Sequence, residues 1–236
     1  MKKALGLTGL VIFLFLMFPV GTIFAQAIKL DFNKTAHLII DVQLDYCSPK
    51  GAFAQATGLT MEPMVAAAKR IDAFVKASRD VLKPVWIRTE EYVETIAPNL
   101  RWGALAWAAE KPLTLCKIGT PGYDYFIVKP LAGEKEIHKN HYAGFFNPEL
   151  ERYLRQNNID TIVYSGVLAS RCVYATMVCG SALGFKSVIL EDLVENPLEL
   201  SSEKKEFLKV ARLLFAKVVK SNDILATINI KSKISN

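Results

Sequence analysis

The chain has 236 residues, of which 51% are hydrophobic and 22% charged, and its formal net charge is +6. This length suits one α/β domain with a core of its own, so neither a metal ion nor a disulfide is needed to hold the fold together. The positive charge is small and its lysines and arginines are scattered, which excludes a nucleic-acid-binding surface.

The first 27 residues have the pattern of a secretory signal peptide. Two lysines precede an apolar run from Leu5 to Val20, and Ala25 and Ala27 are the small residues of a cleavage site. The run is shorter than the roughly 20 apolar residues that a membrane-spanning helix needs. Because residues 1–27 hold two lysines and no acidic residue, their removal lowers the net charge from +6 to +4. We expect residues 28–236 to form one exported domain, periplasmic or secreted, without stable membrane association; an uncleaved anchor is the alternative.

Strand and helix patterns alternate along the rest of the chain. The expected strands are 37–43, 84–89, 134–139, 161–165, 187–190 and 217–220. The expected helices are 60–82 (capped by Thr60), 148–157, 172–183, 201–216 and a short one at the C-terminus. This alternation predicts a doubly wound α/β fold, with a six-stranded parallel sheet and helices on both faces. Residues 90–130 lack periodicity, and so long an irregular stretch usually covers or lines a site.

Three reactive residues end or closely follow predicted strands, although they are far apart in the sequence. Asp41, Lys139 and Cys172 should therefore meet at the carboxyl edge of the sheet, where ligands bind in folds of this kind. Each alone has an ordinary explanation, as a turn residue, a solvated charge or a buried helix residue. Their shared placement favours a site.

The chemistry of the three residue types fits thiol-mediated acyl transfer. Cys172 opens a predicted helix, where unpaired N–H groups and the helix dipole favour a thiolate and could stabilise an oxyanion. A neighbouring ammonium on Lys139 would lower the pKa of the thiol further. Asp41 could accept the thiol proton and return it to a leaving amine.

Three sequence blocks surround these residues. They are Ile39-Ile-Asp-Val-Gln-Leu-Asp-Tyr46, Lys139-Asn-His-Tyr-Ala-Gly-Phe-Phe146 and Gly166-Val-Leu-Ala-Ser-Arg-Cys-Val-Tyr-Ala-Thr176. In this order and spacing they resemble the isochorismatase-like cysteine hydrolases, a family that includes nicotinamidases and N-carbamoylsarcosine amidohydrolases. The resemblance covers about residues 36–228.

The resemblance implies roles for particular residues. Asp41, Lys139 and Cys172 match the family's catalytic residues. A cis peptide bond between Val167 and Leu168 is implied as well, with the backbone N–H groups of Leu168 and Cys172 forming the oxyanion hole.

The implied activity is hydrolysis of a small amide-type C–N bond through a thioester, with a small-molecule substrate and no cofactor. Nicotinamidases bind a metal through an Asp-x-His after the second strand, whereas the corresponding stretch Arg88-Thr-Glu-Glu-Tyr-Val-Glu94 contains no histidine. We therefore expect no metal site. Hydrolysis of an ester or carbamoyl bond, or a secreted binding protein of the same fold without turnover, are the alternatives. Thiol–disulfide exchange is disfavoured because the chain has no Cys-x-x-Cys, and a homodimer or homotetramer is expected from the family.

Several aromatic residues are candidates for the substrate pocket. They are Tyr46, Trp86, Tyr142 and Phe145, with Tyr92, Trp102 and Trp107 as further candidates in the irregular stretch. Two cysteines outside the site, Cys47 and Cys116, either form a disulfide or are small buried residues, and burial is the favoured reading. Cys172 and Cys179 lie two helical turns apart, which is too far for a bridge.

Overall fold

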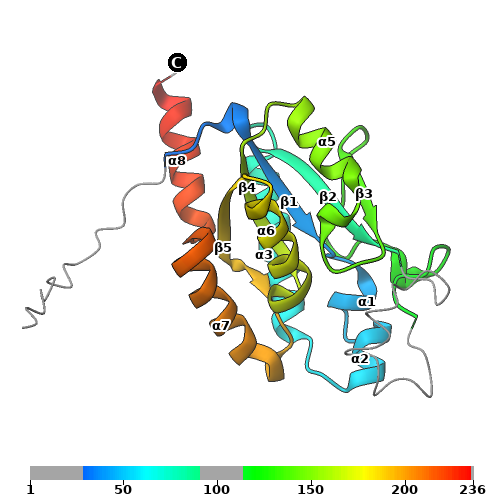
Figure 1. The fold of residues 1–236 in the computed structure, drawn as a ribbon. Helices are drawn as coiled ribbons and strands as arrows, with labels where there is room; N and C mark the ends of the chain where they lie inside the picture. The colour runs from blue at the N-terminus through cyan, green and yellow to red at the C-terminus, as the bar shows by residue number, and fades with distance from the viewer. Residues whose placement is uncertain (1–28, 91–113, 235–236) are drawn as a thin grey trace, which may run out of the picture.

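Six parallel strands form the sheet at the centre of the molecule, in the order β3-β2-β1-β4-β5-β6 (Figure 1). The structure is a computed structural model and describes residues 29–90 and 114–234. The strands are β1 (Thr35–Ile40), β2 (Lys83–Thr89), β3 (Lys135–Lys139), β4 (Thr161–Val167), β5 (Lys186–Glu195) and β6 (Ala216–Val219). The strand order reverses direction between β1 and β4, which is where ligands bind in doubly wound sheets. The predicted fold class is confirmed.

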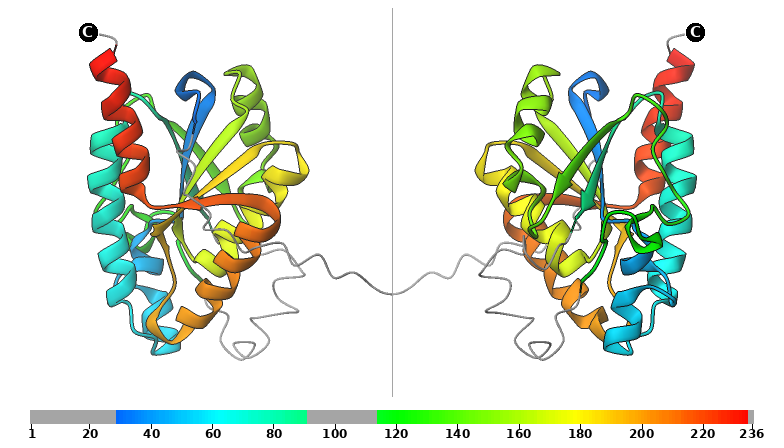
Figure 2. Two further views of the ribbon diagram at one scale, coloured as in Figure 1. Left: turned by 90° about the vertical axis from the view of Figure 1, so that its left-hand side faces the viewer. Right: turned by 90° about the vertical axis from the view of Figure 1, so that its right-hand side faces the viewer.

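Helices cover both faces of this sheet (Figure 2). One face carries α3 (Glu62–Ser78) and α8 (Ser221–Ile234), and the other carries α5 (Pro148–Gln156), α6 (Tyr174–Ala182) and α7 (Ser201–Val210). The short helices α1 (Leu44–Cys47) and α2 (Ala52–Thr57) follow β1. Single 3₁₀ turns are η1 (Phe32–Lys34), η3 (Pro121–Tyr123), η4 (Gly144–Phe146) and η6 (Leu198–Leu200), and π turns are η5 (Ala169–Val173) and η7 (Ala211–Phe215).

The central strand β1 explains why the sheet needs two layers of helices. All six of its residues are buried. Because neighbouring side chains point to opposite faces, Ile39 packs in the core under α3, whereas Leu38 and Ile40 pack in the core under α5 and α6. A continuous apolar strand of this kind is typical of a parallel sheet that is covered on both sides.

The start of α3 differs from the prediction. Thr60 was expected to cap this helix, but α3 begins at Glu62 and the N-cap position is held by Met61. Thr60 instead binds Glu199 in η6, donating its hydroxyl to Oε1 at 2.7 Å and its N–H to Oε2 at 3.0 Å. Thr60 is thus bonded to a distant segment and caps no helix.

Two further helices differ from their predicted bounds. The helix expected from residue 172 begins earlier, because the π turn η5 leads into α6 at Tyr174. The helix expected over 201–216 ends its α-helical part at Val210 and continues as the π turn η7.

Several predictions lie outside the described residues: the signal peptide, its cleavage site, and the aromatic residues Tyr92, Trp102 and Trp107. Within residues 29–90 and 114–234, no helix is long and apolar enough to cross a membrane. All four cysteines belong to the described ranges and are thiols in the structure, with Cys47 and Cys116 fully buried. The predicted burial of this pair is therefore confirmed, and the disulfide is not formed.

Candidate active site

Asp41 follows the last residue of β1 and turns its carboxylate across the carboxyl edge of the sheet. Its backbone is left-handed, with φ of 53°, a conformation that Asp and Asn adopt more readily than most residues. The Asp41 N–H donates to the Ile87 carbonyl oxygen at 3.0 Å, which ties this turn to β2. Its side chain is buried, so the carboxylate must find its partners inside the protein.

The partner of this carboxylate is Lys139, the last residue of β3. Lys139 Nζ lies 2.8 Å from Asp41 Oδ2, and only 1% of each side chain is exposed. The contact is an ion pair outside hydrogen-bonding geometry, because Oδ2 accepts no hydrogen bond from the described residues. A buried ion pair needs further hydrogen bonds to offset the lost hydration of both charges.

Thr89, the last residue of β2, supplies those hydrogen bonds. Its Oγ1 accepts a hydrogen bond from Lys139 Nζ at 2.8 Å and donates one to Asp41 Oδ1 at 2.9 Å. The hydroxyl therefore joins base and cation into one buried group. No role was predicted for Thr89 from the sequence, because a threonine at the end of a strand is not distinctive by its residue type, although the strand end is where ligands bind in such sheets.

Gln43 holds Thr89 in place through the backbone. Its Oε1 accepts from the Thr89 N–H at 2.8 Å, and its Nε2 donates to the Thr89 carbonyl at 3.0 Å. The same Nε2 donates to the Tyr123 carbonyl at 3.0 Å, which fixes η3 against the site. This glutamine belongs to the first sequence block, and the structure shows that its amide orders the end of β2.

Cys172 is the third reactive residue and contacts the Lys139 ammonium. It lies in η5 after β4, with 7% of its surface exposed. Lys139 Nζ donates a weak hydrogen bond to Cys172 Sγ at 3.6 Å. One ammonium thus contacts both the buried carboxylate and the thiol, so the structure brings together the three residues that the sequence analysis selected. Short π-helical segments often occur at functional sites.

The turn before Cys172 depends on a glycine. Gly166 has φ of 121°, and a Cβ on it would lie 2.1 Å from the Ile40 carbonyl oxygen. No other residue fits there, because the left-handed backbone and the close approach both exclude a side chain. The close approach of Gly166 to Ile40 brings the end of β4 beside the end of β1, which Asp41 follows. The peptide bond between Val167 and Leu168 is cis, as the resemblance implied.

Thr176 links the second and third sequence blocks. Its Oγ1 donates to the Cys172 carbonyl at 2.6 Å and accepts from the Gly144 N–H at 2.9 Å. The segment after Lys139 is thereby attached to the helix that carries the thiol.

Two of the four aromatic pocket candidates have ring or hydrogen-bond partners away from the charged group. Trp86 is fully buried, and its indole N–H donates to Glu134 Oε2 at 2.8 Å, before the start of β3 and hence at the opposite edge of the sheet. Phe145 stacks on Phe185, which precedes β5, with ring centroids 5.7 Å apart. Trp86 is core packing, and its assignment to the pocket is corrected. Phe145 is half-buried and packs against the core, and its place in the pocket stays a prediction.

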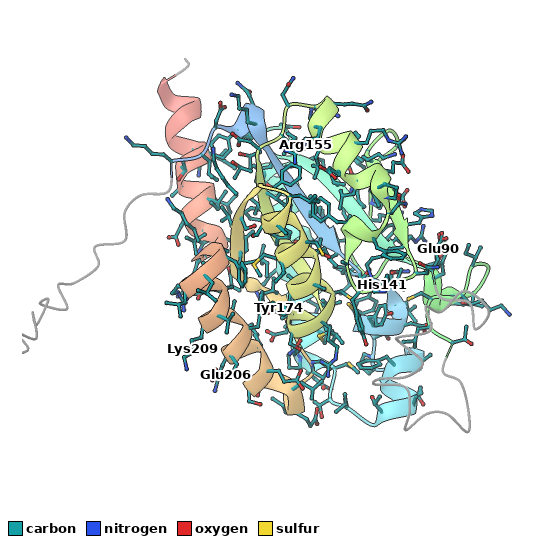
Figure 3. All side chains as sticks on the ribbon, viewed as in Figure 1. Glu90, His141, Arg155, Tyr174, Glu206 and Lys209 are labelled. Carbon is teal, nitrogen blue, oxygen red and sulfur yellow. The ribbon has the colours of Figure 1, made fainter. Side chains whose placement is uncertain are left out.

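The other two candidates stay near the strand ends. Tyr46 packs edge-to-face on Phe53, and Tyr142 is half-buried just beyond β3. Next to it, His141 stacks on Phe146 with ring centroids 4.4 Å apart. Partial burial, and then the ammonium of Lys139, lower the pKa of His141. In the view of Figure 3, His141 lies between α6 and Glu90, and no role was predicted for it from the sequence.

Glu90, which follows Thr89, is held by two neighbouring side chains. Glu90 Oε1 accepts from the Tyr123 hydroxyl at 2.5 Å and pairs with His138. In the part of the chain that the structure describes, no three His, Cys, Asp or Glu side chains gather as they would to hold a metal ion.

Comparison with known proteins points to one family. A sequence model of the isochorismatase domain matches residues 35–223. Ureidoacrylate amidohydrolase RutB from Caulobacter segnis is 28% identical over 179 residues, covering 71% of this chain and 74% of that protein.

Solved structures share the fold. A cysteine hydrolase from Pseudomonas syringae pv. phaseolicola has a TM-score of 0.72 at 19% identity, covering 85% of this chain and 94% of its own. N-carbamoylsarcosine amidase from Thermoplasma acidophilum has a TM-score of 0.63 at 22% identity, covering 80% of this chain and 96% of its own.

Proposed function

Because the chain belongs to the isochorismatase family of hydrolases, we propose that it cleaves a small amide-type C–N bond through a thioester on Cys172. One observation carries this proposal: the buried Lys139 ammonium contacts both Asp41 Oδ2, at 2.8 Å, and Cys172 Sγ, at 3.6 Å. The similarity to a ureidoacrylate amidohydrolase extends the substrate class to ureido and carbamoyl compounds.

In the first half of the reaction, Asp41 takes the proton of the Cys172 thiol. Its Oδ2 accepts no hydrogen bond from the described residues and is therefore the oxygen available for this proton. The thiolate attacks the substrate carbonyl carbon, and the backbone N–H groups of Leu168 and Cys172 hold the oxyanion. Asp41 returns the proton to the nitrogen as the C–N bond breaks, which leaves a thioester and a free amine or ammonia.

In the second half, water replaces the amine. Asp41 takes a proton from the water, the oxygen attacks the thioester carbonyl, and the C–S bond breaks as the thiol is protonated again. The product is a carboxylic acid, or a carbamic acid when the substrate is a carbamoyl compound. Lys139 keeps its proton throughout and stabilises the negative charge that moves between Asp41 and Cys172.

The proposal includes independence from metals and cofactors. Its support is the stretch Arg88–Glu94, which has no histidine where nicotinamidases have their metal-binding Asp-x-His. Transition metals such as zinc favour imidazole or thiolate ligands.

Release of ammonia from small amides, ureides and carbamoyl compounds, with a chelator present, tests this function. Cys172→Ala should lower turnover by at least about 10³-fold, since the nucleophile is lost. Cys179→Ala is the matched control, because this thiol lies on the same helical segment but outside the site, and it should keep full activity. Substantial turnover by Cys172→Ala, or inactivation by the chelator, would contradict the mechanism.

Asp41→Asn tests the role of Asp41 as the base independently of the reactivity of Cys172. Asparagine tolerates the left-handed backbone at this position, so the variant removes the charge without straining the turn. Turnover should be lost while Cys172 still reacts with iodoacetamide, because Lys139 remains beside the sulfur. Loss of both properties would show that Asp41 only supports the fold of the site.

We also propose that the chain is exported and cleaved after Ala27, as the pattern of residues 1–27 indicates. N-terminal sequencing of the native protein should find Ile28 as the first residue. An intact N-terminus in the membrane fraction would mean that the segment is retained as an anchor.

A further inference from the structure

A buried amide lies beside the turn that carries Cys172. Asn196 directly follows β5, and only 1% of its surface is exposed. Glu195, the last residue of β5, is paired with Val167, the last residue of β4, so Asn196 lies at the carboxyl edge of the sheet. Because a buried amide loses its hydration, it needs hydrogen-bond partners inside the protein. Those of Asn196 reach into η5, directly before Cys172.

Both ends of the Asn196 amide are bonded. Its Oδ1 accepts from the Ser170 N–H at 3.3 Å, whereas its Nδ2 donates to Ser170 Oγ at 3.0 Å and to the Leu200 carbonyl oxygen at 3.0 Å. Rotating the amide by half a turn would set its NH₂ group against the Ser170 N–H, donor against donor, so these partners determine its orientation. The amide therefore holds Ser170 by its backbone and by its side chain.

The bond to the Ser170 N–H has the role of a helix cap. The first N–H groups of a helical turn have no partner inside the turn, and a polar side chain at the N-cap position usually accepts from the second or third of them. The N-cap of η5 is Leu168, whose side chain forms no such bond, and Ser170 is the second residue of the turn. Asn196 Oδ1 thus supplies, from the end of β5, the acceptor that the turn itself lacks.

The Ser170 hydroxyl extends this contact to α7. It accepts from Asn196 Nδ2 and donates to Glu203 Oε2 at 2.7 Å. Arg171 Nη1 donates to the same carboxylate oxygen at 2.9 Å and to Ser170 Oγ at 3.2 Å. Since the amide NH₂ group can only donate and the carboxylate can only accept, the direction of the hydrogen bonds on either side of the hydroxyl is determined. The turn is therefore bonded to two other elements, the end of β5 and α7.

We propose that Asn196 is a positioning residue: its amide holds η5 at the pitch that keeps the Cys172 sulfur in contact with the Lys139 ammonium. This contact between Sγ and Nζ is 3.6 Å long, so a small rotation of the turn would break it. Ser170 stands two residues before Cys172 and two after Leu168, the residues whose N–H groups hold the oxyanion in the proposed reaction. The same bonds therefore maintain the spacing of these N–H groups, and this kinetic part of the inference rests on the proposed function.

Two readouts of Asn196→Ala test this role: the alkylation of Cys172 by iodoacetamide as a function of pH, and the turnover per reactive thiol. Without the amide, the sulfur should lose its contact with Lys139, so the alkylation profile should move to higher pH. The value of kcat/KM, counted per reactive thiol, should fall on the order of 10²-fold, because displaced catalytic groups react poorly. A purely structural asparagine would lower only the melting temperature.

Asn157→Ala is the matched control, because it also removes the side-chain hydrogen bonds of a partly buried asparagine. Its Nδ2 donates to the Tyr153 carbonyl oxygen at 2.9 Å, and its Oδ1 accepts from Lys83 Nζ at 3.0 Å, at the opposite edge of the sheet. This control should keep the wild-type profile and kcat/KM. The same result in Asn196→Ala would overturn the proposal. A wild type that cleaved no amide would contradict the proposed reaction alone, since the alkylation profiles would still decide the role of Asn196.

Asn196→Asp is the conservative variant and tests the cap itself. Aspartate caps helical turns as well as asparagine does, so it can still accept from the Ser170 N–H, whereas the donor to the Leu200 carbonyl is lost. This variant should be less stable than the wild type, but it should retain more turnover than Asn196→Ala and an alkylation profile closer to that of the wild type. Equal losses in both variants would show that the acceptor for the Ser170 N–H does not position the turn, which would overturn the proposal.

Discussion

At the scale of single residues, Thr89 is the side chain on which the charged pair depends. Its hydroxyl accepts from Lys139 and donates to Asp41. Thr89→Val keeps the shape but removes both hydrogen bonds, so the ammonium and the carboxylate lose their shared partner. We expect kcat/KM to fall on the order of 10²-fold, as small displacements of catalytic groups do. Thr89→Ser retains the hydroxyl and should stay close to the wild type.

The pH profile of kcat/KM distinguishes positioning from a purely structural role. If Thr89 only supported the fold, Thr89→Val would lower the melting temperature and leave the profile of the folded enzyme unchanged. A shifted profile with an intact fold is the expected result. Full activity in Thr89→Val would show that the hydroxyl bridge plays no part in the reaction.

The sequence identified the residues that are both chemically reactive and placed at or near the end of a predicted strand. Asp41, Lys139 and Cys172 are reactive residues that end or closely follow strands, and both properties can be recognised in a sequence. Threonine is common in strands for reasons of packing, so the same position at Thr89 gave no distinct signal. Trp86 was misplaced because it lies three residues before the end of β2, and its indole bonds Glu134 at the opposite edge of the sheet.

At the scale of elements, the π turn η5 shows what a local pattern cannot predict. The sequence from Ala169 to Val173 contains neither proline nor glycine, and nothing in it marks a change of helical pitch. The turn is held from outside, since the Ser170 N–H donates to Asn196 Oδ1 at 3.3 Å and its hydroxyl bonds Glu203. Asn196 directly follows β5 and Glu203 lies in α7, so the geometry around Cys172 is set by tertiary contacts.

Strand β5 was predicted too short for a related reason. Glu191 and Asp192 interrupt its apolar run, which placed the predicted end at residue 190. In the structure Asp192 accepts hydrogen bonds from the N–H and the hydroxyl of Ser221, at 2.8 and 2.6 Å. The start of α8 thus satisfies a carboxylate that would otherwise disfavour a strand.

At the scale of the whole molecule, stability should depend on the protonation of His37. This residue is buried on β1, and its Nε2 lies 2.7 Å from Ser165 Oγ. Burial lowers its pKa from 6.5 to about 3. Below pH 6.5 the unfolded chain binds a proton that the folded protein does not, so the free energy of unfolding falls as the pH is lowered. Between pH 7 and pH 5 the loss should be about 2 kcal/mol.

Urea denaturation at pH 7, 6 and 5 measures this dependence. His37→Gln keeps a polar group for Ser165 but cannot titrate, so its free energy of unfolding should change less over the same range. Equal pH dependence in both proteins would show that His37 is not held in its neutral form.

The reversal of strand order between β1 and β4 has a consequence for when reactivity arises. Asp41 is made early, Cys172 follows more than a hundred residues later, and the two meet only when β4 has joined β1. A nascent chain therefore carries an ordinary cysteine. A single cut anywhere between Asp41 and Cys172 leaves no fragment that holds the complete site. The Cys172 thiol therefore meets Asp41 and Lys139 only when synthesis and folding are almost finished.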